Sequence, residues 1–250
     1  MSVKKIEKRI LRQVGKAIAD YNLIEEGDRV MVAVSGGKDS YALLHILEIL
    51  RRKAPIKFSI IAVNIDPNFS GYRTEVIADH LVEFGFEHEM VKANIYETIE
   101  NHIDPNTSYC SFCSRLRRGV IYNKAVELGC TKIALGHHLD DFIETSLLNQ
   151  FFNGELKAMA AKLVSDDKRN VVIRPLVNVE EDVIIEYSQL KEFPIICCCC
   201  PVCGTEEMMR KKVKKLLREL SGDYPGIKRS MLKSLSNVNM RHLLVKDLSV

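Results

Sequence analysis

The stretch of the chain that most constrains its fold runs from Val30 to Leu50 and reads VMVAVSGGKDSYALLHILEIL. It opens with a continuous valine-rich run, which is typical of a buried strand in a parallel sheet. Leu43, Leu47 and Leu50 then recur at helical spacing. The two glycines in between let the backbone approach a ligand that a Cβ atom would push away. The segment therefore predicts a strand, a tight turn and a helix whose N-terminus binds an anion, with phosphate as the natural ligand.

The residues of the turn decide which kind of phosphate loop it forms. A Walker loop requires a glycine five residues before its last glycine and Ser or Thr directly after its lysine, but those positions hold Val32 and Asp39. The SGGKDS turn instead resembles the PP-loop of the ATP pyrophosphatase superfamily, whose members cleave ATP between the α and β phosphates and pass AMP to an oxygen of the substrate. The alternative is a glycine turn with a chance lysine. The resemblance implies ATP as co-substrate and assigns its binding to Ser35, Gly36, Gly37, Lys38, Asp39 and Ser40.

The composition sets outer limits on the class of protein. A chain of 250 residues with 46% hydrophobic content can bury one large core, or one core and an appendage. No apolar run approaches the roughly 20 residues of a membrane span, and the charged N-terminus contains no signal-peptide apolar stretch. We therefore expect a cytoplasmic protein with no membrane partner. The net charge of only +3 indicates no partner by itself.

Beyond the PP-loop, strand and helix patterns alternate at a spacing that is typical of a parallel sheet. We expect helices over Lys4–Tyr21 and Arg73–Phe84 and strands over Lys57–Asp66 and Phe86–Val91. The predicted fold class is α/β, a doubly wound parallel sheet of the PP-loop ATP pyrophosphatase (adenine nucleotide alpha hydrolase-like) type with helical N- and C-terminal additions. We expect an N-terminal helix over 1–26, a PP-loop ATPase domain over 27–204 and a basic helical extension over 205–250. Since ligands of such sheets sit beyond the carboxyl ends of the strands, Asp66 is expected beside the adenine and ribose.

A second turn at a strand end follows Thr131 and reads GHHLDD. We expect this turn, which begins at Gly136, to lie opposite the SGGKDS turn and to contribute to the nucleotide site. Asp140 and Asp141 then open a helix, where acidic residues are ordinary partners of the helix dipole. The functional alternative is that Asp141 holds Mg²⁺ on the phosphates. Further on, a strand is expected over Val171–Val177, at an edge position that would tolerate its proline.

The chain contains eight cysteines, which in a reducing compartment are more often metal ligands or redox groups than structural disulfides. Cys110 and Cys113 form a C-x-x-C pair that could bind one metal. A thioredoxin-like redox pair is the alternative, but this motif follows a third strand, which favours metal. Cys200 and Cys203 form a second pair. Together the two pairs could make a four-thiolate zinc site or hold an iron–sulfur cluster, and spacing alone does not choose between them.

The C-terminal part is strongly basic from Met208 onward and shows the periodicity of an amphipathic helix, followed by a second short helical segment. Such a face is often merely solvated. Combined with the arginines that follow the first cysteine pair, it predicts a track for an RNA backbone, with salt-dependent and sequence-independent affinity. The residues concerned are Arg115, Arg117, Arg118, Lys211, Lys212, Lys214, Lys215 and Arg218.

Several motifs, taken in their order along nearly the whole chain, resemble one family. They are SGGKDS, CSFCSRLRRG, GHHLDD, IRPL, FPII followed by C-x-x-C-G, YPG and NV-x-x-x-HL. The set is similar to the tRNA 2-thiocytidine synthetase family (TtcA). The resemblance implies a cytoplasmic, usually dimeric PP-loop enzyme, hence a homodimer, that uses ATP and Mg²⁺ to activate C2 of cytidine 32 in certain tRNAs. It also implies that a cysteine desulfurase supplies the sulfur.

Carried over onto the matching positions, the resemblance implies a [4Fe-4S] cluster held by Cys110, Cys113 and Cys200. We expect one iron to stay open, since sulfur transfer needs a position where an exogenous sulfide can bind. Asp39, Asp141 and Cys200 are then the candidate catalytic residues. The family pattern has Pro-Cys after FPII, whereas this chain has four consecutive cysteines ending at Cys200. Whether Cys203 or one of the preceding cysteines also binds the cluster is therefore left open.

Other classes of protein share part of this pattern. A lysidine-forming PP-loop enzyme would share SGGKDS but has no use for two C-x-x-C pairs. A further alternative is another PP-loop tRNA-modifying enzyme, such as a uridine thiolase. A zinc-stabilised RNA-binding module would need the cysteines but no nucleotide loop.

Overall fold

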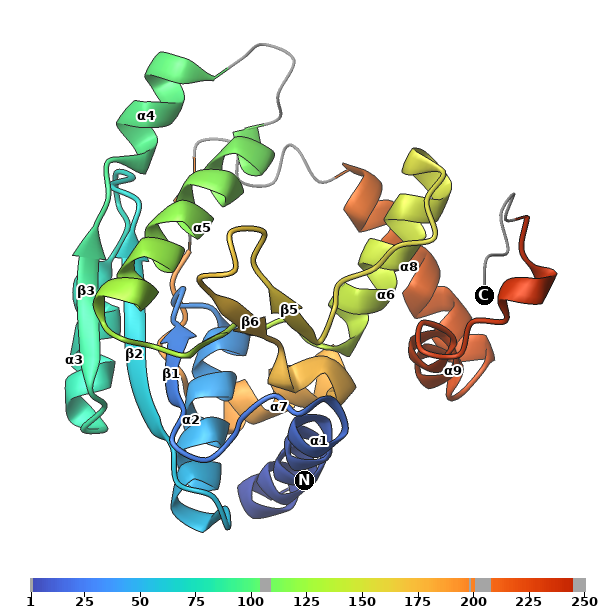
Figure 1. The fold of residues 1–250 in the computed structure, drawn as a ribbon, viewed down its shortest axis with the longest axis horizontal. Helices are drawn as coiled ribbons and strands as arrows, with labels where there is room; N and C mark the ends of the chain where they lie inside the picture. Colours follow the sequence, from blue (N-terminus) through green and yellow to red (C-terminus); the bar gives the residue numbers. More distant parts are fainter. Residues whose placement is uncertain (1, 104–108, 198, 201–207, 245–250) are drawn as a thin grey trace. The chain divides into compact units, whose positions relative to one another are not determined.

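The computed structural model describes residues 2–103, 109–197, 199–200 and 208–244, and its strands form one six-stranded sheet (Figure 1). The strands follow the order β3-β2-β1-β4-β6-β5. Their bounds are β1 Arg29–Ala33, β2 Ser59–Asp66, β3 His88–Lys92, β4 Lys132–Ala134, β5 Lys162–Val164 and β6 Val171–Ile173. Neighbouring strands run parallel except for the β5–β6 pair, which is antiparallel. The predicted α/β fold with a mostly parallel sheet is confirmed.

Helices alternate with the strands along the chain, and helices within residues 1–138 and 160–207 lie on both faces of the sheet (Figure 1). Their bounds are α1 Val3–Tyr21, α2 Lys38–Lys53, α3 Thr74–Glu83, α4 Ile95–His102, α5 Tyr109–Glu127, α6 Leu139–Leu148, α7 Glu181–Leu190, α8 Met208–Asp223 and α9 Ile227–Ser234, with short π or 3-10 turns η1 Asn149–Asn153, η2 Pro175–Asn178 and η3 Met240–His242. Alternate residues of a strand point to opposite faces, and Ile61, Val63 and Ile65 of β2 share one core cluster with residues of α4 and α5. Within the described ranges, no helix has the length and apolar character that a membrane crossing requires.

The strand predicted over Val171–Val177 differs from the observed one in length and position. β6 ends at Ile173, and Pro175 begins η2, because proline has no N–H to donate to a strand ladder. The expected edge position is wrong, since β6 lies between β4 and β5. The edge strand is β5, a three-residue strand that is largely exposed and therefore carries no alternating pattern in the sequence.

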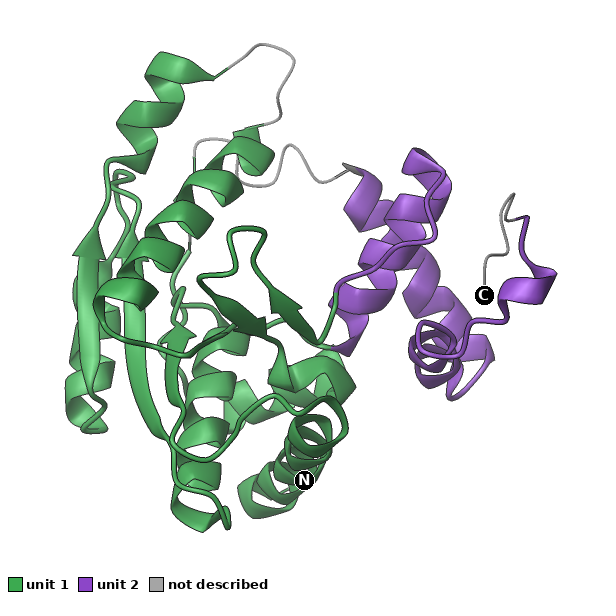
Figure 2. Cartoon of the chain, viewed as in Figure 1, with its two compact units in different colours: residues 1–138, 160–207 green, residues 139–159, 208–250 purple. Residues whose placement is uncertain are grey.

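The chain divides into two compact units (Figure 2). Unit 1 comprises Met1–His138 and Ala160–Glu207 and contains the sheet, whereas unit 2 comprises Leu139–Met159 and Met208–Val250. In unit 2, α6 packs against α8 and α9. The core of unit 2 consists of Leu139, Ile143, Leu147, Val213 and Leu217. This division differs from the sequence-based one, because α1 buries its apolar face within unit 1 and α6 groups with the C-terminal helices.

Two buried histidines join α2 to α3 inside an aromatic cluster. The Nε2 atoms of His45 and His80 are 2.9 Å apart, and Tyr41, Phe84 and Phe193 surround the two rings. Burial, reinforced by the neighbouring imidazole, lowers the pKa of His45 to about 3, and burial also lowers the pKa of His80. Both rings are therefore neutral in the folded protein at pH 7.

This pair is expected to make the protein less stable in mild acid. The unfolded chain takes up protons at His45 below its ordinary pKa of 6.5, whereas the folded chain does so only near pH 3, so stability falls as the pH drops through this window. Between pH 7 and pH 5 the loss from His45 alone is about 2 kcal/mol. Urea unfolding of the wild type and of a His45→Leu/His80→Leu variant at both pH values measures it. An equal pH effect in the two proteins would contradict the assignment.

Candidate nucleotide-binding and catalytic site

The SGGKDS turn leads from β1 into the first turn of α2, as the sequence predicts. Gly36 has φ +79°, a left-handed conformation that favours glycine. Gly37 is the N-cap residue of α2, and in the described structure no side chain caps the first amides of this helix. Uncapped amides at a helix N-terminus bind anions, because they add hydrogen bonds to the positive end of the helix dipole. The turn therefore has the geometry of a phosphate site.

Ser40 and Ile196 hold the turn in this shape. The Ser40 Oγ atom donates to the carbonyl oxygen of Gly37 at 2.9 Å and accepts from the amide of Ser35 at 3.2 Å. The amide of Ile196 donates to the carbonyl oxygen of Gly36 at 3.1 Å. A Cβ atom on Gly36 would lie 2.5 Å from Cγ1 of Ile196. The FPII segment thus backs the loop, and a larger residue at position 36 would collide with it.

The Lys38 side chain is half-buried and contacts two carboxylates. Its Nζ atom lies 3.1 Å from Asp39 Oδ2 and 3.2 Å from Glu181 Oε1. Burial opposes its charged form, but the two carboxylates outweigh this and raise the pKa of Lys38. The ammonium group is therefore charged and held in place beside the turn by two acidic side chains.

The two candidate acidic residues of unit 1 differ in how their oxygens are used. Asp39 Oδ1 is buried and has no hydrogen-bond partner in the described part of the chain, although His138 Nε2 lies 3.8 Å away. A carboxylate oxygen in this situation suits a hard cation such as Mg²⁺. Asp66 uses both oxygens on its own chain, accepting from the amide of Asn68 at 2.8 Å and from Thr74 Oγ1 at 2.7 Å. Its predicted contact with ribose stays a prediction.

The turn after β4 lies directly against the PP-loop, as expected from the strand order. A Cβ atom on Gly136 would lie 3.0 Å from the carbonyl carbon of Asp39 and 3.1 Å from the amide nitrogen of Ser40. His138 Nε2 lies 4.0 Å from Glu181 Oε1. Gly136 is therefore needed for close approach of two backbones, while its role in binding a cofactor stays a prediction.

Replacing Gly136 by alanine is expected to displace the PP-loop. The added methyl group would meet backbone atoms at 3.0–3.1 Å, which cannot move aside as a flexible side chain can, so we expect a stability loss of about 1–3 kcal/mol. Gly119→Ala is the matched control, because position 119 lies within α5 with open space around it; there alanine should stabilise by about 0.5–1 kcal/mol. Thermal unfolding measures both changes, and equal stability of the two variants would contradict the close packing.

Cys113 and Cys200 both belong to one core region of unit 1. Cys110 and Cys113 lie near the start of α5, the first exposed and the second buried. Cys200 is half-buried and packs against the core cluster that contains Cys113 and Tyr109. Burial raises the pKa of the Tyr109 hydroxyl to about 12, with Cys200 and Cys113 among the further causes, so both thiols lie near this hydroxyl.

The donor chemistry of these cysteines fits an iron–sulfur cluster, since soft thiolates are its usual ligands. Cys113 and Cys200 supply two such groups from segments far apart in the sequence. Among the described residues, no group of three or more Cys, His, Asp or Glu side chains could hold a metal ion. Cys198 and Cys203 lie outside the described residues. The ligand set of Cys110, Cys113 and Cys200 therefore stays a prediction.

Unit 2 carries Asp141 and the predicted basic helix. Asp140 is buried and lies 2.5 Å from Lys228 Nζ, which gives it a structural role. Asp141 occupies the first turn of α6, and its role toward Mg²⁺ stays a prediction. On α8, Val213 and Leu217 are buried. The basic residues of α8 are exposed or, for Lys214, half-buried, which confirms an amphipathic basic helix; they are Lys211, Lys212, Lys214, Lys215 and Arg218.

The sequence did not predict two charged residues that the fold brings to the PP-loop and to the turn after β4. Glu181 reaches Lys38 from α7, and its only signal in the sequence is an acidic residue in a first helical turn. Arg174 is buried and donates from Nε to His137 Nδ1 at 3.2 Å. The signal for Arg174 is a charged residue inside the apolar run VVIRPLV.

β1 and β4 are parallel neighbours in the sheet. At the carboxyl end of β1, a glycine turn leads into the uncapped N-terminus of α2, which is the arrangement of a PP-loop nucleotide-binding protein. Comparison with known proteins agrees, since residues 5–195 match the PP-loop domain family. The tRNA-cytidine(32) 2-sulfurtransferase of Citrifermentans bemidjiense is 56% identical over 241 residues, which cover 96% of this chain and 94% of that protein. The protein of the same name from Geobacter metallireducens is 55% identical with the same coverage. The chain belongs to the tRNA-cytidine(32) 2-sulfurtransferase family.

A solved structure supports the fold independently. The U34-tRNA thiolase NcsA from Methanococcus maripaludis, determined with its [4Fe-4S] cluster, aligns with a TM-score of 0.79 at 24% identity, covering 97% of this chain and 82% of that one. NMN synthetase from Francisella tularensis aligns over 99% of both chains with a TM-score of 0.53 at 15% identity. At these identities the likeness concerns the fold alone.

Proposed function

We propose that this chain converts cytidine 32 of tRNA to 2-thiocytidine in an ATP-dependent reaction. The observation that carries the proposal is the PP-loop at the uncapped start of α2, in a chain that is 56% identical to a tRNA-cytidine(32) 2-sulfurtransferase. A base carbonyl oxygen is a poor leaving group, so exchanging it for sulfur requires prior activation. ATP bound at this loop supplies that activation.

The proposed reaction has two steps. In the first, O2 of the cytosine attacks the α-phosphorus of ATP, the bond to the bridging oxygen of the β-phosphate breaks, and pyrophosphate leaves. In the second, a sulfur nucleophile adds at C2, the C2–O bond breaks, and AMP leaves with the former carbonyl oxygen. Both steps develop negative charge on phosphate oxygens, which fixed positive groups stabilise.

The residues of the loop divide this work among them. The amides at the start of α2 and the Lys38 ammonium bind the phosphates of ATP. Asp39, whose Oδ1 lacks a hydrogen-bond partner in the described structure, would hold Mg²⁺, and the Mg²⁺ role of Asp141 in unit 2 is a separate prediction from the sequence.

Cys110, Cys113 and Cys200 would hold a [4Fe-4S] cluster, which when bound supplies the sulfur-transfer chemistry. The packing of Cys200 against the core cluster that contains Cys113 and Tyr109 supports this assignment. Cys200 is also the cysteine we propose to act in catalysis. A cysteine desulfurase would supply the sulfur, and the protein would work as a homodimer in the cytoplasm.

The basic residues of α8 are proposed to bind the tRNA backbone. Replacing Lys211, Lys212, Lys214 and Lys215 by glutamine is expected to weaken tRNA binding and to flatten its dependence on salt. Each phosphate contact that is lost should reduce the slope of log K against log salt by about 0.7–0.9. Filter binding across a salt series measures the slope. An unchanged slope would mean that the basic face of α8 is solvated and does not contact the tRNA backbone.

The proposed function is tested by mass analysis of tRNA nucleosides from a strain that lacks this protein. We expect 2-thiocytidine to disappear and to return when the wild-type chain is supplied. Loss of a thiouridine with 2-thiocytidine intact would instead identify a uridine thiolase. Anaerobic purification separates the remaining alternative, since a colourless zinc protein that binds tRNA without consuming ATP would be an RNA-binding module.

A further inference from the structure

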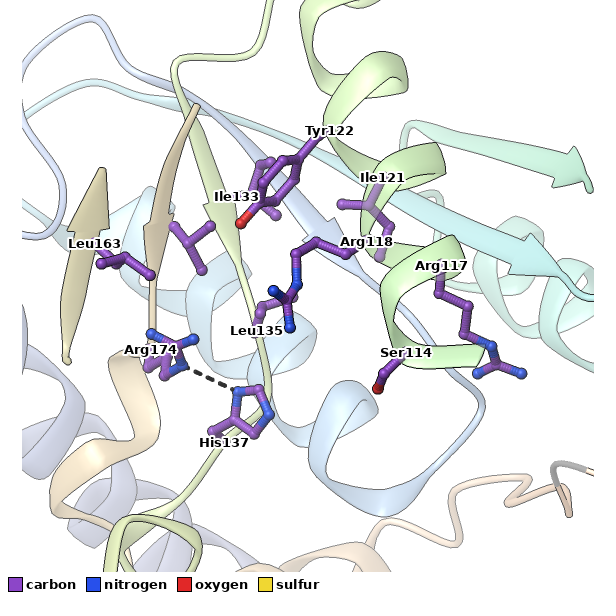
Figure 3. Close-up of a pocket in the computed structure, with 11 residues that line it drawn as sticks. Ser114, Arg117, Arg118, Ile121, Tyr122, Ile133, Leu135, His137, Leu163 and Arg174 are labelled. Carbon is purple, nitrogen blue, oxygen red and sulfur yellow. Dashed lines mark hydrogen bonds between the residues drawn. The ribbon is translucent and has the colours of Figure 1, made fainter. Parts of the chain in front are cut away.

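Unit 1 contains a pocket of about 290 Å³ that the proposed ATP and cluster sites do not use (Figure 3). One wall is the face of α5, and the opposite side is formed by β4, β5, β6 and the segments that follow β4 and β6. Its lining residues are Ser114, Arg117, Arg118, Ile121, Tyr122, Ile133, Leu135, His137, Leu163, Val172 and Arg174. The volume lies at the lower end of the roughly 300–1,000 Å³ of small-molecule sites, so the pocket suits one nucleotide and not a longer segment.

The charge of the pocket indicates an anionic ligand. Three arginines and one histidine are among the described residues that line it, and no carboxylate is. Arg174 is only 9% exposed, and its guanidinium donates to neutral acceptors, His137 Nδ1 at 3.2 Å and the carbonyl oxygen of Ala160 at 2.6 Å. A buried cation is costly without an opposite charge. Arg118 reaches toward the same space, whereas the guanidinium of Arg117 points away from Arg174 (Figure 3).

The remainder of the lining is apolar and aromatic, which suits the body of a nucleobase. The apolar residues Ile133 and Leu135 form the floor, and the Tyr122 ring stands over it (Figure 3). A base gains stability from contact with an aromatic ring or a guanidinium plane, with little dependence on which base it is. An anion-binding end and an apolar end in one small pocket together match a nucleoside monophosphate unit.

The segment after β4 places this pocket next to the PP-loop. Side chains alternate between two sides along an extended segment. Gly136 and His138 approach the PP-loop residue Asp39, whereas Leu135 and His137 line the pocket. The segment after β4 therefore borders both the pocket and the PP-loop.

The α5 face of the pocket leads to the candidate cluster ligands. Ser114, Arg118 and Tyr122 are spaced four residues apart and share one helix face. Cys110 continues the same spacing one turn earlier, near the start of α5. The pocket thus lies along a helix that connects it to the proposed source of sulfur.

We propose that this pocket receives the target pyrimidine nucleotide of the RNA, with its phosphate bound by Arg174 and Arg118 and its base against Leu135 and Tyr122. The inference rests on the proposed function. A paired or stacked base cannot reach a reaction centre inside a protein, so the target nucleotide must be extruded into a pocket of its own. This pocket is small enough to prefer a pyrimidine and lies beside the loop that activates it.

The test compares binding of two probes to the full-length protein by ligand-observed NMR, cytidine 5′-monophosphate (CMP) for the pocket and a non-hydrolysable ATP analogue for the PP-loop. Arg118→Met carries the test, because Arg118 is exposed and its loss leaves the fold intact, whereas Arg174 also holds Ala160. Arg115→Met is the matched control, since Arg115 lies on the same helix outside the pocket and is also exposed.

We expect Arg118→Met to weaken CMP binding by about tenfold and to leave binding of the ATP analogue unchanged. Lys38→Ala should do the reverse, and Arg115→Met should change neither. Cytidine without its phosphate should bind the wild type at least about tenfold more weakly than CMP. Equal CMP affinity in the Arg118→Met and Arg115→Met variants, or displacement of CMP by the ATP analogue, would overturn the proposal.

The fate of the pocket and of the proposed function can be told apart. A wild-type protein that makes 2-thiocytidine but shows no Arg118-dependent CMP binding would reject the pocket and keep the function. A protein that binds CMP in this pocket but leaves tRNA unthiolated would reject the function, and the pocket would stand as a pyrimidine nucleotide site.

Discussion

Replacing Lys38 by alanine is expected to slow ATP-dependent tRNA thiolation by at least about 100-fold. The reason is that Lys38 supplies the full positive charge at the PP-loop, and removal of a preorganised group that stabilises developing charge costs on the order of 10²–10³ in rate. Single-turnover formation of 2-thiocytidine, followed by nucleoside mass analysis, measures the effect. Iron content should stay at the wild-type value, because Lys38 and the cysteines belong to different elements of unit 1.

The structure also predicts a cost in stability that must be separated from the chemistry. Glu181 is 12% exposed in its side chain and would lose its ion pair with Lys38, so we expect Lys38→Ala to be destabilised by about 1–3 kcal/mol. The double variant Lys38→Ala/Glu181→Gln should regain most of this stability and none of the activity. Lys16→Ala removes an exposed ion pair with Asp20 and should leave both properties unchanged. Recovery of activity in the double variant would show that Lys38 acts only through folding.

Serine substitution of Cys110, Cys113 or Cys200 is expected to remove the iron–sulfur cluster, and with it thiolation. A serine hydroxyl is a far harder and less acidic ligand than a thiolate, so loss of one such ligand should release the cluster. Iron and acid-labile sulfide, measured after anaerobic purification, report the loss directly. The visible absorbance of the protein should fall in parallel.

Two further substitutions make this prediction specific. Cys130→Ser is the matched control, because Cys130 is half-buried and its pKa is raised by burial, as expected of an inert thiol; it should keep its iron. Cys203→Ser should also keep the cluster if three protein ligands leave one iron open. Equal loss of iron at Cys203 would mean four protein ligands and would reject the open-iron arrangement.

The parts of the fold that were predictable are those whose signal is local. The valine-rich β1, the glycine turn and α2 form one contiguous segment, and burial of Ile6, Ile10 and Val14 follows the helical spacing seen in α1. In contrast, β5 is three residues long and largely exposed, so it leaves no alternating pattern in the sequence. The proline at position 175 indicates from the sequence alone that the strand is interrupted. The position of β6 within the sheet depends on β5, which the sequence did not predict.

The candidate site divides in the same way. The PP-loop residues are contiguous, and two adjacent glycines followed by a lysine identify them in the sequence. Other residues reach the site from separate segments, and their contacts form only when the chain folds; they are Glu181, Ile196 and Arg174. The sequence therefore predicts a phosphate-binding loop, but it does not predict that Glu181 contacts Lys38 in the structure.

The discontinuous make-up of unit 2 has a consequence for the order in which the chain matures during synthesis. α6 is translated well before α8, yet Leu139, Ile143 and Leu147 find their core partners in Val213 and Leu217 of α8. At a synthesis rate of about 5–20 residues per second, this apolar face stays exposed for on the order of several seconds until α8 has been made. Exposed apolar surface of this kind is the type that chaperones bind and that aggregates at high expression. Synthesis of α8 thus determines when the apolar face of α6 becomes buried.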